Sequence, residues 1–249
     1  DKFKSNITIP RFQNKSYSQK DYYLYTAFVK NKLWHIEQTN CEYDNDFFYV
    51  RSTNIENNLI FFLAKADELN NLNNLKRLND YNTFSNTTPA FRSNLEIKLE
   101  DKGISSYQSE YPFKMVTKTG SIMSSVYSIL NNDASENYLF FRNIFLNPIE
   151  VEFKIYFIDI IKKKIIDIKK AKTNYSNLIL IDKNLIKPEI YIFTNEYLGI
   201  PIYLSHKDGS LSLEHTNPLQ EYVLGNEKFK VITDLKNEIN SKIINENIK

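Results

Sequence analysis

Apolar and polar side chains alternate without a break along residues 151–157 (VEFKIYF), and this pattern most constrains the fold. The apolar positions are Val151, Phe153, Ile155 and Phe157, and the positions between them are Glu152, Lys154 and Tyr156. Successive side chains of a β-strand point to opposite faces of the sheet, so this period of two predicts a strand with one wet face. Lys162 to Lys164 then predict a turn, and a return strand begins at Ile165.

Further strands are predicted throughout the second half, with turn signals about every 8–12 residues, a spacing typical of all-β sandwiches and barrels. The segments are Tyr138–Leu146, Asn177–Ile181, Glu189–Thr194 and Ile200–Ser205. We therefore expect an all-β fold, mainly an antiparallel β-sandwich. Its C-terminal half resembles immunoglobulin-like sandwiches in architecture, although it lacks the Cys and Trp landmarks of true immunoglobulin domains.

The first half is also predicted to be rich in strands. The segments are Asp21–Lys30, Phe47–Val50, Leu59–Leu63 and the alternating run Leu95–Leu99. The polar and aromatic composition of Ser105–Met115, with a central proline, predicts a loop or irregular edge. Leucines recur every third residue from Leu69 to Leu78, which predicts a short Leu-rich helix or loop. The polar stretch after it suggests two parts, an N-terminal β-rich region (1–85) and a β-sandwich with a C-terminal helix (86–249), or one continuous domain.

Near the C-terminus the apolar period changes to that of a helix. Phe229, Ile232, Leu235, Ile239 and Ile243 form one stripe at spacings of three and four. We expect this amphipathic helix to pack on a sheet, with docking on another subunit as the alternative. The second interpretation would make the protein an oligomer through this helix.

Composition excludes several classes of function. The five glycines are isolated, so neither a phosphate-binding Gly-rich loop nor a dinucleotide motif can be assembled, and no cofactor is expected. A net charge of +2 offers no long-range attraction for nucleic acid, although a local patch stays possible. No apolar run has the roughly 18 residues of a membrane span. A single cysteine fits a cytoplasmic protein or one secreted after removal of a signal peptide.

Asp208-Gly209 is the strongest hairpin signal in the chain. A two-residue turn there places His206 and His215 on one apolar face, four rungs or roughly 13 Å apart. That separation is too large for two ligands of one metal ion, so no metal site is expected. The histidines are interpreted as partly buried and hydrogen-bonded.

Aromatic side chains supply the candidate binding surface, because Tyr and Trp rings on an exposed strand can stack on sugars or anchor a protein partner. The candidates are Tyr23, Tyr25, Trp34, Tyr107 and Tyr111. Core packing is the simpler interpretation of the same rings. A second cluster, of lysines between Lys162 and Lys172, is interpreted as protection of a turn and an edge strand, with binding of an anionic polymer as the alternative.

These patterns predict a non-catalytic β-sandwich protein that binds a glycan or a protein partner. The alternatives are a structural or assembly subunit and a carbohydrate-active enzyme, which would need only two carboxylates at a fixed separation and so leaves no short motif. For the enzyme, the candidate catalytic residues are Glu110, Glu214 and His215.

Overall fold

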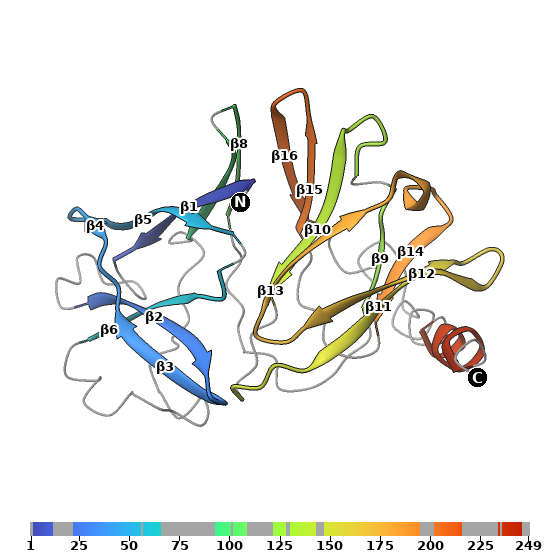
Figure 1. Cartoon of the computed structure of the whole chain (residues 1–249), viewed down its shortest axis with the longest axis horizontal. Helices are drawn as coiled ribbons and strands as arrows, with labels where there is room; N and C mark the ends of the chain where they lie inside the picture. Colours follow the sequence, from blue (N-terminus) through green and yellow to red (C-terminus); the bar gives the residue numbers. More distant parts are fainter. Residues whose placement is uncertain are drawn as a thin grey trace, which may run out of the picture. The chain divides into compact units, whose positions relative to one another are not determined.

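The computed structural model of this chain describes residues 2–11, 22–55, 57–65, 93–100, 102–108, 122–127, 130–142, 147–194, 202–215, 234 and 236–245. Within these residues the protein is mostly β, in several antiparallel sheets with one short C-terminal helix (Figure 1). The predicted all-β class is therefore confirmed. In this part of the chain, no helix has the length and apolar character needed to cross a membrane.

The chain forms two compact units, and each is described by itself. Unit 1 comprises Asp1–Thr117, Ile144–Glu150 and Gly209–Leu211, and unit 2 comprises Lys118–Asn143, Val151–Asp208 and Ser212–Lys249. The domain boundary that the sequence predicts after residue 85 stays a prediction. The strand that follows it, β7 (Asn94–Leu99), pairs with β1 (Phe3–Pro10), so unit 1 extends past that division.

Unit 1 contains two sheets. The first has five strands in the order β4-β5-β1-β7-β8, and the second has three in the order β3-β2-β6. Their remaining bounds are β2 Tyr22–Lys30, β3 Leu33–Gln38, β4 Glu42–Tyr43, β5 Phe47–Asn54, β6 Ile60–Lys65 and β8 Gly103–Gln108. The segment predicted as a loop or irregular edge thus begins as an edge strand, β8.

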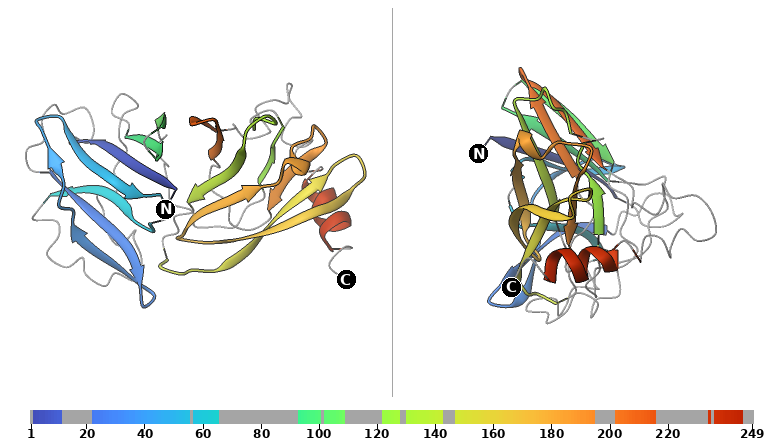
Figure 2. Two further views of the ribbon diagram at one scale, coloured as in Figure 1. Left: turned by 45° about the horizontal axis from the view of Figure 1, so that its top comes forward. Right: turned by 90° about the vertical axis from the view of Figure 1, so that its right-hand side faces the viewer.

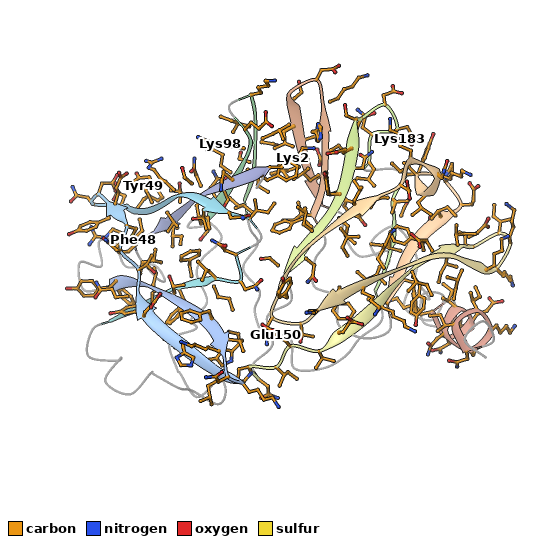
Figure 3. All side chains as sticks on the ribbon, viewed as in Figure 1. Lys2, Phe48, Tyr49, Lys98, Glu150 and Lys183 are labelled. Atoms are coloured by element: carbon orange, nitrogen blue, oxygen red, sulfur yellow. The ribbon has the colours of Figure 1, made fainter. Side chains whose placement is uncertain are left out.

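One apolar cluster joins the two sheets of unit 1. Ile9 and Phe48 come from the five-stranded sheet, and Leu24 and Leu63 come from the three-stranded sheet. Figure 3 shows Phe48 and its neighbour Tyr49 on opposite sides of β5. The period of two therefore divides the five-stranded sheet into an inner face in the core and an outer face.

Unit 2 contains two four-stranded sheets, ordered β13-β10-β15-β16 and β12-β11-β14-β9. The strands are β9 Ile122–Ser125, β10 Glu136–Arg142, β11 Glu152–Asp159, β12 Lys164–Lys172, β13 Ser176–Ile181, β14 Ile190–Thr194, β15 Ile202–Lys207 and β16 Ser210–His215, with the short 3-10 helix η3 at Lys183–Leu185. These bounds confirm the strands predicted from alternation and from turn spacing.

The core of unit 2 lies between these sheets. Leu139, Ile181 and Tyr203 from one sheet meet Phe157 and Ile192 from the other, all at or below 2% exposure. Burial of these side chains stabilises the unit by about 25 cal/mol per Å² of apolar surface removed from water.

The C-terminal helix η5 (Ile239–Ile244) covers the other face of β11. Ile239, Ile243 and Ile244 are buried in one cluster with Tyr156 of β11 and Phe193 of β14, and Figure 2 shows the helix in red beside this sheet. The predicted wet face of β11 is therefore wet only at Glu152 and Lys154, because the helix buries the face from Tyr156 onward. The apolar stripe, as far as it is described, packs within its own unit, and docking on another subunit has no support here.

The predicted hairpin is confirmed at its turn. Asp208 and Gly209 both have positive φ, 49° and 83°, as a two-residue turn of the type favoured between twisted strands requires. The Leu-rich segment predicted at residues 69–78 lies outside the described residues.

Candidate ligand-binding surface

The outer face of the five-stranded sheet in unit 1 carries a row of polar side chains that crosses four strands. Strand pairing sets Glu42 on β4 opposite Tyr49 on β5, Tyr49 opposite Thr8 on β1, and Asn6 on β1 opposite Glu96 on β7. Because inner-face residues alternate with these, the same pattern that builds the core also aligns the polar row.

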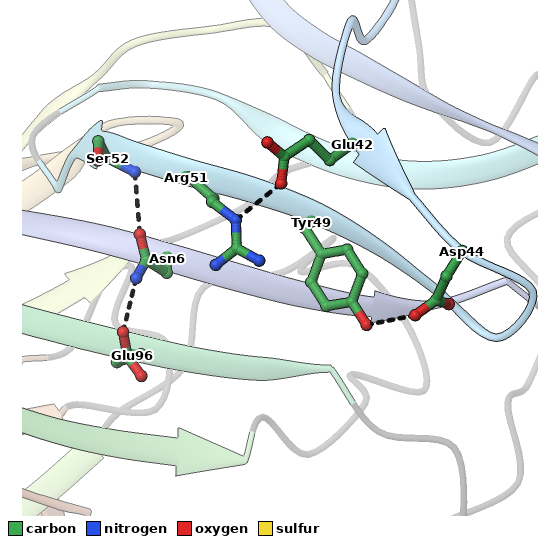
Figure 4. Close-up of polar contacts among 7 residues, drawn as sticks. All are labelled: Asn6, Glu42, Asp44, Tyr49, Arg51, Ser52 and Glu96. Atoms are coloured by element: carbon green, nitrogen blue, oxygen red, sulfur yellow. Dashed lines mark hydrogen bonds and ion pairs between the residues drawn. The ribbon is translucent and has the colours of Figure 1, made fainter.

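Asn6 sits at the centre of the row, opposite a β-bulge in β5 that brings Ser52 to its side chain. The register between β1 and β5 shifts between Ser5 and Ile7, and Ser52 adopts a positive φ of 53°. The Asn6 Oδ1 accepts a hydrogen bond from the Ser52 backbone N–H at 3.0 Å, and its Nδ2 donates to Glu96 Oε1 at 2.6 Å (Figure 4). A side chain held at both ends of its amide loses little freedom when a ligand binds.

Arg51 extends the row toward the edge of the sheet. Its Nε donates to Glu42 Oε2 at 3.0 Å, and its guanidinium lies 5.1 Å from the centre of the Tyr49 ring. Both ionic side chains remain accessible, with 55% of Arg51 and 75% of Glu42 exposed. The pairing occupies only Nε, so the Nη hydrogens of Arg51 remain for another acceptor.

Asp44 fixes the Tyr49 ring from the turn between β4 and β5. Its carboxylate accepts hydrogen bonds from the Tyr49 hydroxyl at 2.7 Å and from the backbone N–H groups of Asp46 and Phe47, each at 2.8 Å. The Tyr49 hydroxyl, followed by these backbone donors, holds the pKa of Asp44 below its usual value. In turn, donation to the carboxylate raises the pKa of Tyr49.

The other end of the row is ionic. Lys98 Nζ lies 3.4 Å from Glu96 Oε1, with 38% and 30% of the two side chains exposed. The resulting surface, termed the polar strip, consists of Asn6, Glu42, Tyr49, Arg51, Glu96 and Lys98. Its charges are paired, its planar groups are anchored, and it is open to solvent.

The structure divides the aromatic residues predicted to bind a ligand. Trp34 and Tyr25 are packed in the interior of unit 1, at 1% and 7% exposure, whereas Tyr23 is 41% exposed. Buried rings offer no face to a ligand, so core packing explains Trp34 and Tyr25. The backbone of Tyr107 lies in β8 opposite Leu95, but its side chain lies outside the described residues. All of Tyr111 lies outside the described residues as well.

Among the predicted catalytic residues, only the side chain of Glu214 lies in the described part of the chain. Glu214 is exposed on β16. Glu110 and the side chain of His215 lie outside the part of the chain that is described. Among the described residues, no group of three His, Cys, Asp or Glu is placed to hold a metal ion.

His206 belongs to a separate polar cluster in unit 2. Its Nε2 lies 2.7 Å from Glu136 Oε2, and the Tyr138 hydroxyl donates to the same oxygen at 2.6 Å. Burial, reinforced by that carboxylate, raises the pKa of Tyr138 strongly, so the phenol stays protonated. The cluster ties β15 to β10, and the interpretation of His206 as partly buried and hydrogen-bonded is confirmed.

The sequence alone does not predict most of the polar strip. Alternation did place Glu96 and Lys98 on a wet face, and Tyr49 lay in a recognised aromatic run. The contact of Asn6 with Ser52 has no sequence signal, because it depends on a bulge in β5.

Comparison with protein-family models, with curated proteins and with solved structures found no match to this chain. The function is therefore argued from the geometry of these surfaces.

Proposed function

We propose that this is a non-catalytic protein built of β-sandwich units, the C-terminal one immunoglobulin-like, that binds a glycan on the polar strip of unit 1. The fold part is supported by the two-sheet core in each unit. The observation that carries the binding part is a pair of anchored groups on one face of the sheet, the Asn6 amide bonded to Glu96 and the Arg51 guanidinium bonded to Glu42 beside the Tyr49 ring.

The chemistry of this strip matches that of a sugar. Each sugar hydroxyl both donates and accepts, so amide, carboxylate and guanidinium groups side by side satisfy neighbouring hydroxyls. The apolar face of a sugar ring stacks on an aromatic ring whose hydroxyl end stays wet, as Tyr49 provides. Since these groups already hold one another, little further ordering is needed on binding.

The composition of the strip favours a glycan over a protein partner. Protein interfaces have a centre depleted of charge and rich in buried apolar or aromatic anchors. Here the charged side chains Arg51, Glu96 and Lys98 lie on the inner strands β5 and β7, whereas the exposed apolar side chains Tyr43 and Ile104 lie on the edge strands β4 and β8.

The spacing of the acids disfavours a glycosidase at this face. Glu42 and Glu96 lie on β4 and β7, three strand intervals apart. At about 4.8 Å per interval, their strands are about 14 Å apart. The catalytic pairs of glycosidases are only about 5–9.5 Å apart. Each acid is also paired with a cation, which favours a binding role.

A glycan array, followed by calorimetry with each sugar it identifies, tests the proposal. We expect Arg51→Ala to weaken binding at least about tenfold, since it removes charge-assisted hydrogen bonds. Glu96→Gln should weaken binding less, because the amide keeps one acceptor. Lys154→Ala, on the exposed part of β11 in unit 2, is the matched control and should leave affinity unchanged.

Two outcomes contradict the proposal. One is the absence of any glycan ligand for the folded full-length chain. The other is a ligand whose affinity is unaffected by both Arg51→Ala and Glu96→Gln, which would place the binding site elsewhere.

A further inference from the structure

The turn that joins β11 to β12 in unit 2 presents an apolar side chain to solvent. Ile161 is 77% exposed, the highest fraction among the large apolar side chains in the described part of the chain. The turn itself is the end of the β11–β12 hairpin, in yellow at the right of Figure 1. Turns are ordinarily built of small and polar residues, so the exposure of an isoleucine here needs a cause.

The turn is held rigid by Asp159, whose side chain is only 3% exposed. One carboxylate oxygen accepts hydrogen bonds from the backbone N–H groups of Ile161, at 3.0 Å, and Lys162, at 2.7 Å. Lys163 completes the turn with a positive φ of 53°. The backbone donors hold the pKa of Asp159 below its usual value, so the carboxylate stays ionised and the turn keeps its shape near neutral pH.

Three consecutive lysines follow the exposed isoleucine. Lys162 pairs with Asp159 at 3.4 Å, and Lys163 pairs with Glu238 at 2.5 Å, with 66% and 59% of the lysine side chains exposed. Lys164 is exposed and has no ion-pair partner in the described part of the chain. Lys242 on η5 lies 3.6 Å from the same Glu238. These four lysines face two acids, so the end of the hairpin carries an excess of positive charge.

Of the remaining lysines of the cluster, two are paired with acids, and Lys172 lies over the Tyr175 ring. Lys169 lies 2.8 Å from Asp167, and Lys170 lies 2.8 Å from Glu152. The excess charge therefore concentrates at the turn, beside Ile161, rather than along the edge strand.

We propose that the β11–β12 turn docks on the surface of an anionic lipid membrane, with Ile161 entering the interface and Lys162 to Lys164 contacting headgroup phosphates. This inference is independent of glycan binding, which concerns unit 1. A nucleic acid or other polyanion would use the lysines but not the apolar tip. A lipid surface uses both, because it offers negative charge at the headgroups and apolar tails beneath them.

Sedimentation of the full chain with sucrose-loaded vesicles tests the proposal. We expect binding to vesicles of phosphatidylcholine and phosphatidylserine, and little binding to phosphatidylcholine alone. Ile161→Ser should lower the partition coefficient about tenfold through loss of apolar insertion. The triple change K162Q/K163Q/K164Q should lower it further, at about fivefold per lysine.

Matched controls come from elsewhere on the surface. Ile104→Ser replaces another exposed isoleucine, 58% exposed and in unit 1. Lys183→Gln replaces a lysine on η3, which Figure 3 labels well away from the hairpin turn. Neither should change vesicle binding. Thermal unfolding should also be unchanged by Ile161→Ser, because a side chain in solvent contributes little to stability.

A tryptophan probe reports insertion directly. Trp34, the single tryptophan, is buried and gives a constant background. In the Ile161→Trp variant, we expect emission to shift to shorter wavelength on anionic vesicles and to be quenched by brominated lipid. The proposal is overturned if the wild type binds neither vesicle, if Ile161→Ser binds as well as the wild type, or if the tryptophan emission does not change.

Discussion

Individual aromatic side chains in this protein divide sharply between core and surface. Trp34 on β3 is 1% exposed, whereas Tyr23 on the preceding strand β2 of the same sheet is 41% exposed. Aromatic density in a sequence cannot distinguish these cases, since a ring suits either side of a pleated sheet.

Replacing Trp34 is therefore expected to test the core rather than a binding surface. Trp34→Ala should lower the free energy of unfolding by about 3–5 kcal/mol, because it leaves a large cavity. Tyr23→Ala, from the exposed face, should cost less than about 1 kcal/mol. Urea denaturation measures both. Equal costs for the two changes would contradict the placement of Trp34 in the interior.

A second prediction at the residue scale concerns Asp44. Its folded-state pKa is lowered, chiefly by the Tyr49 hydroxyl. The stability that this carboxylate contributes is therefore fully present above its unfolded pKa of about 3.9, and it is lost as the pH falls through the folded value. Tyr49→Phe should move the pKa of Asp44 up toward the ordinary value, as measured by an NMR titration of the carboxyl carbon.

The Asp44→Asn variant serves as the control for that titration. Its stability should change less with pH in the acid range than that of the wild type, because the titrating group is gone. An Asp44 pKa that stays equally low in Tyr49→Phe would show that the backbone donors alone are responsible.

At the scale of elements, β11 shows that positions on one face of an alternating strand can be exposed at one end and buried at the other. Glu152 and Lys154 lie on a wet face, but Tyr156 and Ile158 on that same face are buried by η5. Sequence alternation correctly gives the strand and its inner face. It cannot show that a segment far along the chain covers half of the outer face, since that depends on tertiary packing.

Helix η5 is accordingly expected to stabilise unit 2. Ile243→Ala should cost about 2–5 kcal/mol in unfolding free energy, since Ile243 is 3% exposed within the apolar cluster on β11. Ser241→Ala, on the exposed side of the helix, should be close to neutral. Thermal denaturation followed by circular dichroism distinguishes them. Similar melting temperatures for the two variants would mean that the helix does not dock on the sheet in solution.

Part of the candidate site can be predicted from the secondary-structure elements that the sequence indicates. The strands, the Asp208-Gly209 turn and the wet positions Glu96 and Lys98 follow from local periodicity and turn chemistry. The hydrogen bond between Asn6 and Ser52, which joins residues 46 positions apart, depends on a bulge in the pairing of β1 with β5. Register shifts of this kind leave no local pattern, so the polar strip could be assembled only from the structure.

At the scale of the whole molecule, two compact units imply two separate cores. Trp34 is buried in unit 1, and Ile243 is buried in unit 2. The costs of Trp34→Ala and Ile243→Ala should therefore add within about 0.5 kcal/mol in the double variant. Denaturant titration of the two single variants and the double variant provides the measurement. A larger departure from additivity would reveal energetic coupling between the units.

The docking of η5 has a consequence for the order of events during synthesis. Phe193 leaves the ribosome well before its covering residue Ile244, which follows about 50 residues later, or several seconds at about 5–20 residues per second. During that interval one side of β11 and β14 is uncovered. The nascent chain then exposes an apolar surface to which chaperones can bind. A pause in translation before the last helix would prolong that exposure.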